Sequence, residues 1–425
     1  DIPFVKMPYV DNQLLATKEQ TEKTEGFTFG QEFQVDYNLF NAGIWTQLVN
    51  GDRMWRLGVS SQGAYSINLV FNRFYLPENS TMFIYTKDKR HVLGAFTAKN
   101  NTKDKVFPTT VLPGDEIVIE YYEPKEVKDQ AEIHLSSVVH AYKDVFFTQG
   151  KYGRSGPCHT NINCDEGLSF QDVKRSVALI LYINQAMCTG SLINNTANDE
   201  TPYLLTAKHC LTNKNPSYFV FVFGYETLGC DNNTGSNGFS ISGATLIADG
   251  SNSDFALLKL NTKPPFSYSP YYAGWNRSNI AVMPSFCIHH PSGDYKKISI
   301  CTSILESSSY DEVVPNTHWE VTAWSKGATE AGSSGSALLN FNKQIIGQLE
   351  GGTSSCYNPT GYDLYGKLSY SWTNNDNSNP NKRLKDWLDP LNTETYSLVA
   401  FDPCIPKYQY DASILEINYP TASIC

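Results

Sequence analysis

Three short motifs in this chain carry side chains that together could perform nucleophilic catalysis. One apolar run leads into His209, the acid Asp254 precedes another, and Ser334 lies in a tight turn between Gly332 and Gly335. A serine hydroxyl is a weak nucleophile at neutral pH and needs a base to accept its proton. A histidine has a pKa near the operating pH, and a carboxylate fixes its tautomer and stabilises the imidazolium. Each motif alone is common in structural roles, so only their combination indicates catalysis.

The order of these motifs along the chain is His209, Asp254, Ser334. This order belongs to the chymotrypsin arrangement and not to the other folds that carry the same triad. We therefore predict His209 as the general base, Asp254 as the group that orients it and Ser334 as the nucleophile. Gly332 lets the backbone turn, so that its N–H group and that of Ser334 converge on the developing oxyanion. Loss of one such donor typically costs about 10²–10³ in rate.

A second hypothesis comes from a different class: a non-catalytic relative of proteases that serves as a binding or adhesion module, with the N-terminal part as its adhesive surface. Such a module is expected to have a damaged triad or oxyanion turn, whereas both are intact here. Reaction with a fluorophosphonate distinguishes the two hypotheses, because only a catalytic serine is labelled covalently.

The composition indicates a folded protein of two or three domains. The chain has 425 residues, of which 41% are hydrophobic and only 18% charged. The formal net charge of −10 argues against nucleic-acid binding, which needs a cationic surface. The longest apolar run, residues 177–183, has the length of a buried strand and is too short to span a membrane, so no membrane segment is expected.

The N-terminal block, residues 1–150, contains no cysteine, and apolar residues alternate with polar ones in runs such as 117–121. Several such runs at short spacing predict an antiparallel β-sandwich, and no helix of convincing length is expected there. A Gly-rich polar segment, residues 148–157, marks the end of this block. It contains Lys151 and Arg154, after which a protease could cut.

Residues 151–402 are predicted to form the catalytic domain, again mostly of short strands. One helix is expected near its end, with a start signal at residues 379–380 and a stop at Pro390. Residues 403–425 are a C-terminal extension. Its strand-like run, residues 412–419, suggests the start of a further β domain.

All ten cysteines lie from Cys158 onward, and no Cys-x-x-Cys motif occurs. The even number and the spacing disfavour zinc ribbons and favour disulfides formed in an oxidising compartment, so a secreted or cell-surface protein is expected. His289 and His290 are adjacent and would point to opposite faces of a strand, which makes joint chelation of one metal difficult. We interpret them as structural and expect neither a metal nor another cofactor.

Beyond the triad, several segments resemble the bacterial lysyl endopeptidases, the Lys-C type of secreted trypsin-fold protease. The most specific ones surround the catalytic histidine and serine and comprise residues 188–199, 205–210 and 332–336. The other similar segments are residues 273–276, 288–291, 347–349 and 383–390. The resemblance covers roughly residues 153–400, and the N-terminal block is similar to the β-rich pro-regions that precede such enzymes.

The resemblance implies an all-β protein: a chymotrypsin-like double β-barrel preceded by an antiparallel β-sandwich pro-domain. It implies a secreted serine endopeptidase in zymogen form, with the pro-domain as an intramolecular partner. The substrates would be proteins and peptides with Lys, or as the alternative Arg, at the cleavage position. The roles of His209, Asp254 and Ser334, and of the N–H groups of Gly332 and Ser334, carry over directly.

The resemblance also implies three disulfides. They are Cys158–Cys356, Cys164–Cys230 and Cys188–Cys210. Cys287 and Cys301 lie outside that set and are expected to pair with each other. Cys404 and Cys425 remain; they pair with each other, or Cys425 belongs to a downstream domain.

The resemblance places the acid of the primary specificity pocket on Asp363. A carboxylate at the bottom of a narrow slot favours a cation at the cleaved position, since its charge would otherwise be buried unpaired. The choice between Lys and Arg depends on the depth of the pocket and on whether the pocket binds a compact ammonium or the planar, forked guanidinium. The resemblance favours Lys. Glu330 is the next candidate if Asp363 does not select the substrate.

The chain departs from known patterns at two positions. Ser333 stands where animal trypsin relatives have an acid that captures a freed N-terminal ammonium, so activation by that ion pair is not available.

Glu350 stands where lysyl endopeptidases carry a His paired with a Trp, and residues 307–315 contain no Trp. Glu350 precedes Gly351 and Gly352, which by resemblance bind the substrate backbone upstream of the cut. Its carboxylate either attracts Lys or Arg to upstream sites or selects nothing.

Overall fold

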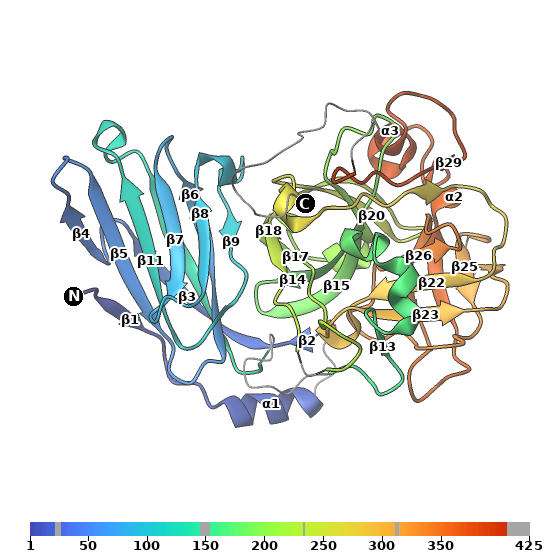
Figure 1. Cartoon of the computed structure of the whole chain (residues 1–425), viewed down its shortest axis with the longest axis horizontal. Helices are drawn as coiled ribbons and strands as arrows, with labels where there is room; N and C mark the ends of the chain where they lie inside the picture. The colour runs from blue at the N-terminus through green and yellow to red at the C-terminus, as the bar shows by residue number, and fades with distance from the viewer. Residues whose placement is uncertain (22–26, 145–153, 233, 311–313, 406–425) are drawn as a thin grey trace, which may run out of the picture.

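The chain forms two β-rich parts that lie side by side, an N-terminal sandwich and a larger C-terminal part (Figure 1). The computed structural model describes residues 1–21, 27–144, 154–232, 234–310 and 314–405. The expected cut site at Lys151, the strand-like run 412–419 and Cys425 lie outside these ranges. Within them, no helix is both long and apolar enough to cross a bilayer.

The N-terminal part is a sandwich of two sheets, as the alternating pattern predicted. The first sheet has the order β1 (Phe4–Lys6), β5 (Arg53–Ser60), β11 (Glu116–Glu123), β7 (Thr81–Thr86) and β8 (Val92–Phe96), with β4 (Ile44–Gln47) on β5. The second has the order β10 (Leu112–Pro113), β6 (Ser66–Tyr75), β12 (Glu132–Ala141) and β3 (Gly30–Asn38), with β9 (Phe107–Pro108) on β6. Inward-facing apolar side chains of both sheets form one core, which includes Trp55, Leu69 and Tyr121.

The sandwich also carries a helix of 10 residues, α1 (Asn12–Thr21), so the expectation that no helix of convincing length occurs in this block was wrong. The side chain of Asp11 accepts a hydrogen bond from the backbone N–H of Leu14 at 3.0 Å and so caps the first turn. Leu14 and Leu15 are adjacent, and Leu14 is half exposed. The helix therefore lacks the apolar stripe by which a surface helix can be identified from its sequence.

The C-terminal part is built from two large, mainly antiparallel sheets. The first has the order β18 (Phe239–Ser242), β17 (Phe219–Phe223), β14 (Val177–Tyr182), β15 (Gln185–Leu192), β16 (Tyr203–Ala207), β20 (Phe255–Leu260) and β19 (Ala244–Gly250). The second has the order β13 (Thr160–Asn161), β23 (Lys297–Cys301), β22 (Ser285–His289), β26 (Ala337–Asn340), β27 (Ile345–Gly352), β28 (Asp363–Lys367), β25 (His318–Val321) and β24 (Glu306–Ser308). Each sheet has its own apolar core, and a further apolar cluster lies between them. The predicted all-β architecture is confirmed.

The helix expected near the end of this part is interrupted. It consists of the 3₁₀ turn η9 (Pro380–Lys382) and the short helix α3 (Lys385–Leu388). The side chain of Asn379 accepts a hydrogen bond from the N–H of Asn381, as expected of a start signal. Another single turn, α2 (Leu368–Ser371), follows β28.

Besides the linker around Lys151, a strand pairing and an apolar cluster join the two parts. Strand β2 (Phe27–Thr28), from the N-terminal block, pairs with the start of β15 and so extends a sheet of the C-terminal part. Beside it, Phe29 and Val139 from the N-terminal block share an apolar cluster with Leu181 and Val220 from the C-terminal part. The N-terminal block therefore buries apolar surface against the sheet that it extends.

The three disulfides that the resemblance implied are present. They are Cys158–Cys356, Cys164–Cys230 and Cys188–Cys210. The expected bond between Cys287 and Cys301 was wrong, because both are buried free thiols. Cys287 lies opposite Ser299 and Cys301 lies opposite Ser285, so the two cysteines are diagonal neighbours on β22 and β23. Such neighbours are roughly 7–8 Å apart, beyond the usual reach of a disulfide. Cys404 is disulfide-bonded.

Candidate active site

Two neighbouring strands bring the predicted base and its orienting acid together. Ala207, the last residue of β16, lies opposite Phe255, the first residue of β20, so His209 and Asp254 meet at this end of the pair. The Asp254 carboxylate accepts the backbone N–H of His209 at 2.8 Å and lies 2.6 Å from ring atom Nδ1. Asp254 is buried, whereas the His209 side chain is 40% exposed. The carboxylate thus holds the ring from the protein side while the ring faces the cavity.

Ser334 lies in a turn whose backbone depends on two glycines. Gly332 has φ +92° and Gly335 has φ +81°, both in the left-handed region that favours glycine. A Cβ at Gly332 would lie 2.8 Å from the carbonyl oxygen of His290, and one at Gly335 would lie 2.1 Å from Oγ1 of Thr206. Within the described part of the chain, the N–H groups of Gly332 and Ser334 have no acceptor. Both donors are therefore available to an oxyanion.

A cavity of about 440 Å³ collects these groups. Its lining residues are Met187, Cys188, His209, Cys210, Lys214, Tyr310, Ala331, Gly332, Ser334 and Glu350. All of them belong to the C-terminal part. A second cavity of about 540 Å³, between β8 and β18, contains no residue of the predicted triad. The predicted base and nucleophile, His209 and Ser334, therefore both line the smaller cavity.

Among the described residues, two clusters have the spacing of metal ligands, but neither offers a thiolate. They are Cys158, His159 and Cys356, and Cys188, His209 and Cys210. In each cluster the two sulfur atoms form a disulfide, whereas a cysteine ligand must be a free thiolate.

His289 and His290 have separate hydrogen-bond partners, consistent with the structural interpretation. The ring of His289 lies 2.7 Å from Oγ of Ser333 and 3.1 Å from Oγ of Ser299. Nδ1 of His290 lies 2.9 Å from the carbonyl oxygen of Asp294. Burial lowers the pKa of both rings, that of His290 to about 3. Neutral rings in these positions support the backbone around the turn of Ser334.

Asp363, the first residue of β28, is fully buried, and one of its two carboxylate oxygens is saturated. Oδ2 accepts hydrogen bonds from Trp324 Nε1 at 2.6 Å, Thr329 Oγ1 at 2.9 Å and Ser354 Oγ at 2.5 Å. None of the described residues donates to Oδ1. Burial raises the pKa of Asp363 above its usual value, against the lowering effect of the three donors. Oδ1 of Asp363 is therefore a buried oxygen without a hydrogen-bond donor among the described residues, and Asp363 is not among the residues that line the cavity of His209 and Ser334.

Gly352 borders this buried oxygen. It lies directly opposite Asp363 in the pairing of β27 with β28, and a Cβ there would be 2.4 Å from Oδ1. Gly351 is less constrained, because the atom nearest to its Cβ would be the hydroxyl of Tyr310 at 3.7 Å. Only Gly352 borders the carboxylate, and a Cβ there would also lie 2.2 Å from the carbonyl oxygen of Tyr362.

Glu350 lies in a bulge of β27, and its side chain lines the cavity together with Ser334. Its Oε2 lies 2.6 Å from Nε2 of His318, which is fully buried and lies 2.7 Å from Oγ1 of Thr317 through its other ring nitrogen. Burial raises the pKa of Glu350, against the lowering effect of His318. The side chain is 17% exposed, so it faces the cavity rather than bulk solvent.

Sequence reasoning missed the residues that hold these two carboxylates. They are Trp324, Thr329 and Ser354 around Asp363, and His318 beside Glu350. His318 belongs to β25, Trp324 and Thr329 to the loop after β25, and Ser354 to the loop between β27 and β28, and no motif marks them. Glu330, the alternative specificity acid, is bonded to Gly156 and Ser292 and does not line the cavity.

The family model "Lysyl endopeptidase, C-terminal domain" matches residues 152–366. This range includes the predicted triad and Asp363. Lysyl endopeptidase of Pseudomonas aeruginosa is 26% identical over 342 residues, which cover 74% of this chain and 72% of that protein.

Two solved structures show weaker similarity. The HtrA-type protease AlgW with tripeptide has a TM-score of 0.34 and 17% identity, over 47% of this chain and 58% of that chain. The Rv3671c protease of M. tuberculosis in its inactive form has a TM-score of 0.34 and 15% identity, over 51% of this chain and 93% of that chain.

Proposed function

Since this chain belongs to the lysyl endopeptidase family and is a serine endopeptidase, we propose that it cleaves peptide bonds after lysine through an acyl-enzyme on Ser334. The observation that carries the specificity is the single unpaired oxygen of the buried Asp363. The observations that support the catalytic role are the His209–Asp254 pair and the cavity that His209 shares with Ser334.

In the proposed acylation, His209 accepts the proton of the Ser334 hydroxyl while the hydroxyl oxygen attacks the carbonyl carbon of the scissile bond. Asp254 stabilises the resulting imidazolium through Nδ1. The N–H groups of Gly332 and Ser334 donate to the oxyanion. His209 then gives its proton to the leaving amine as the C–N bond breaks. Water, deprotonated by the same imidazole, hydrolyses the ester and releases the acid product.

The preference for lysine over arginine follows from the state of Asp363. An ammonium is a compact charge that one oxygen can bind, whereas a guanidinium binds best when its fork meets two oxygens. Three protein donors already occupy Oδ2. We therefore expect lysine substrates to react faster than arginine substrates.

We also propose that residues upstream of the cut follow the edge of Gly351 and Gly352 toward Glu350. A lysine side chain that reaches Asp363 passes Gly352, so the preceding residues run along β27 to its bulge. Oε1 of Glu350 has no donor from the described chain and can attract an upstream cation. Because the site is partly exposed, the gain is about 0–1 kcal/mol.

We propose the domain organisation that the sequence suggested: a pro-domain over residues 1–150, the protease over 151–402 and an extension over 403–425. Separate apolar cores in the sandwich and in the C-terminal part support this division. Cleavage after Lys151 or Arg154 would release the mature enzyme. The three disulfides favour an oxidising compartment and so support secretion.

The test is active-site labelling combined with peptide cleavage. Wild type should react with a fluorophosphonate at Ser334 and hydrolyse a lysine peptide, whereas Ser334→Ala should fold normally and do neither. Circular dichroism checks the fold. Wild type that is folded but not labelled would refute the nucleophile and support the binding-module alternative. Labelling without preference for lysine would refute only the role of Asp363.

A further inference from the structure

The turn that carries Ser334 rests on a support loop, residues 290–294. The N–H of Ser292 donates to the carbonyl oxygen of Ala331 at 2.6 Å. The loop also limits the space behind Gly332, whose Cβ would lie 2.8 Å from the carbonyl oxygen of His290. The direction of the Gly332 N–H group therefore depends on the position of this loop.

The support loop ends in Asp294, a fully buried carboxylate that binds the segment directly after the linker. Its Oδ2 accepts the N–H of Arg154 at 2.9 Å, the N–H of Ser155 at 3.0 Å and the hydroxyl of Ser155 at 2.7 Å. Its Oδ1 accepts the N–H of Tyr295 at 2.7 Å, and Nζ of Lys297 lies 3.5 Å from Oδ2. Two of these three donors from the segment are main-chain N–H groups, and the Arg154 guanidinium adds a hydrogen bond to the carbonyl oxygen of Gly293 in the support loop.

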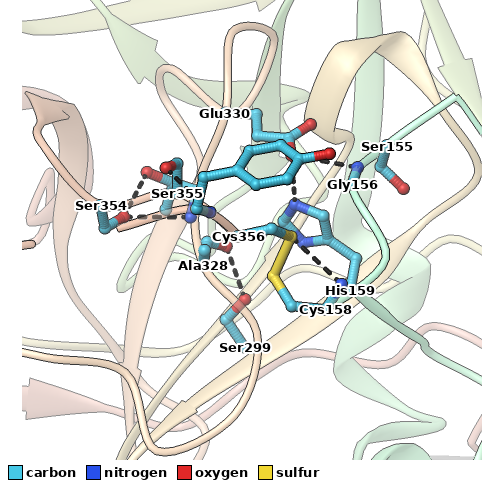
Figure 2. Close-up of a disulfide and its surroundings, with 12 residues drawn as sticks. Ser155, Gly156, Cys158, His159, Ser299, Ala328, Glu330, Ser354, Ser355 and Cys356 are labelled. Atoms are coloured by element: carbon cyan, nitrogen blue, oxygen red, sulfur yellow. Dashed lines mark hydrogen bonds and ion pairs between the residues drawn. A yellow bond between two sulfur atoms is a disulfide. The ribbon is translucent and has the colours of Figure 1, made fainter. Parts of the chain in front are cut away.

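Glu330 connects the same segment to the start of the turn (Figure 2). The N–H of Gly156 donates to Oε1 at 3.0 Å, and Nε2 of His159 lies 3.1 Å from that oxygen. The hydroxyl of Ser292 donates to Oε2 at 2.8 Å, which links Glu330 to the support loop. Figure 2 shows Gly156 and Glu330 joined in this way beside the Cys158–Cys356 disulfide, which holds the segment covalently.

We propose that the anchor segment, residues 154–156, orders the catalytic turn from within the chain, with Asp294 and Glu330 as positioning residues. The proposal rests on the role of Ser334 as nucleophile. The anchoring donors include amide N–H groups, so no newly freed ammonium is required. A cut after Lys151 leaves these groups unchanged, whereas a cut after Arg154 would divide the segment. The cavity is lined by the C-terminal part. Ser334 is therefore reactive while the chain is still joined to its N-terminal block.

The first test compares uncut and cut chains. Lys151→Ala blocks cleavage after that residue, and a mass spectrum verifies the intact chain of 425 residues. A small fluorophosphonate then reports the reactivity of Ser334 without requiring access for a protein substrate. The second-order rate constant should lie within tenfold of that of wild type cut after Lys151. A larger deficit overturns the proposal, whereas no reaction of either form refutes the nucleophile itself.

The second test separates positioning from stability. Asp294→Asn is compared with Asp389→Asn, because Asp389 is also a buried acceptor, bonded to Thr393 and Glu394, and does not line the cavity. For a lysine ester, Asp294→Asn should lower kcat at least tenfold with KM within twofold, and the control should change neither by more than twofold. If Asp294→Asn does not fold, Glu330→Gln should show the same split. Equal losses in the control, or a loss confined to KM, overturn the proposal.

Discussion

Replacing Asp363 by asparagine should remove lysine specificity while leaving the nucleophile reactive. The three donors that hold Oδ2, from Trp324, Thr329 and Ser354, are fixed in place, so the amide oxygen of the variant should take that position. The amide nitrogen then replaces Oδ1 and turns its two N–H groups toward the substrate ammonium. An attractive buried contact thus becomes a repulsive one.

The magnitude follows from the complete burial of Asp363. Removing one partner of a buried charged pair costs roughly 3–5 kcal/mol, and water cannot replace the lost partner at a fully buried position. With a factor of ten for each 1.4 kcal/mol, kcat/KM for a lysine peptide should fall by roughly 10²–10⁴. A peptide with alanine at the cleavage position has no cation to lose and should change little.

The assay measures kcat/KM of wild type and Asp363→Asn on matched peptide amides with Lys, Arg and Ala at the cleavage position. The rate of fluorophosphonate labelling of Ser334 serves as the control for an intact turn and should be unchanged. A lysine peptide cleaved within fivefold of the wild-type rate would refute Asp363 as the specificity acid. An equal loss on the alanine peptide would show that the substitution damages the site in general.

A pair of glycine variants tests the same slot by shape instead of charge. Gly352→Ala places a methyl group 2.2 Å from the carbonyl oxygen of Tyr362 and 2.4 Å from Oδ1 of Asp363 and should lower activity on lysine peptides, whereas Gly351→Ala meets its nearest atom at 3.7 Å and should be tolerated. Similar kcat/KM values for the two variants on a lysine peptide would contradict the geometry of the slot.

Three further outcomes are expected. Replacing Cys188 and Cys210 by alanine should lower the free energy of unfolding by about 2–4 kcal/mol in urea titrations. An unchanged free energy of unfolding would show that this disulfide does not stabilise the folded chain. Wild type should prefer upstream Lys or Arg in a peptide library at low salt, and Glu350→Gln should abolish this preference. In wild type the preference should also fade as pH falls through the raised pKa of Glu350, because protonation removes the negative charge. After cleavage after Lys151, the N-terminal block should co-elute with the protease in gel filtration, held by β2 and the shared apolar cluster; separate elution would show that the linker alone joins them.

The parts of the molecule that could be predicted from the sequence are those encoded by local motifs. The glycines next to Ser334 indicate its turn, alternation along single strands indicates the sandwich, and the Cys188–Cys210 disulfide follows from the resemblance of the segments around His209 to a known family. The bond between Cys287 and Cys301 was expected because both cysteines lay outside the implied set. Strand register decides the outcome instead, since a diagonal position on neighbouring strands separates them.

The partners of the two carboxylates beside the cavity could not be predicted, because tertiary packing brings them together. Trp324 and Ser354 lie in different loops, and both reach the same oxygen of Asp363. His318 meets Glu350 only because β25, β28 and β27 are consecutive in the sheet. An acidic residue in the sequence therefore indicates a charge, but which of its two oxygens lacks a donor depends on partners that no motif marks.

Three buried aspartates of the C-terminal part illustrate why the presence of a carboxylate oxygen without a donor matters more for function than the charge itself. Asp254 has one oxygen on the backbone of His209 and the other at its ring, and Asp294 uses both of its oxygens on protein donors. Only Asp363 keeps an oxygen that no described residue reaches. A buried acceptor without a partner costs about 1–3 kcal/mol, which a lysine ammonium relieves when it binds. The first two carboxylates are thus suited to hold protein groups in place, and the third is suited to select the substrate.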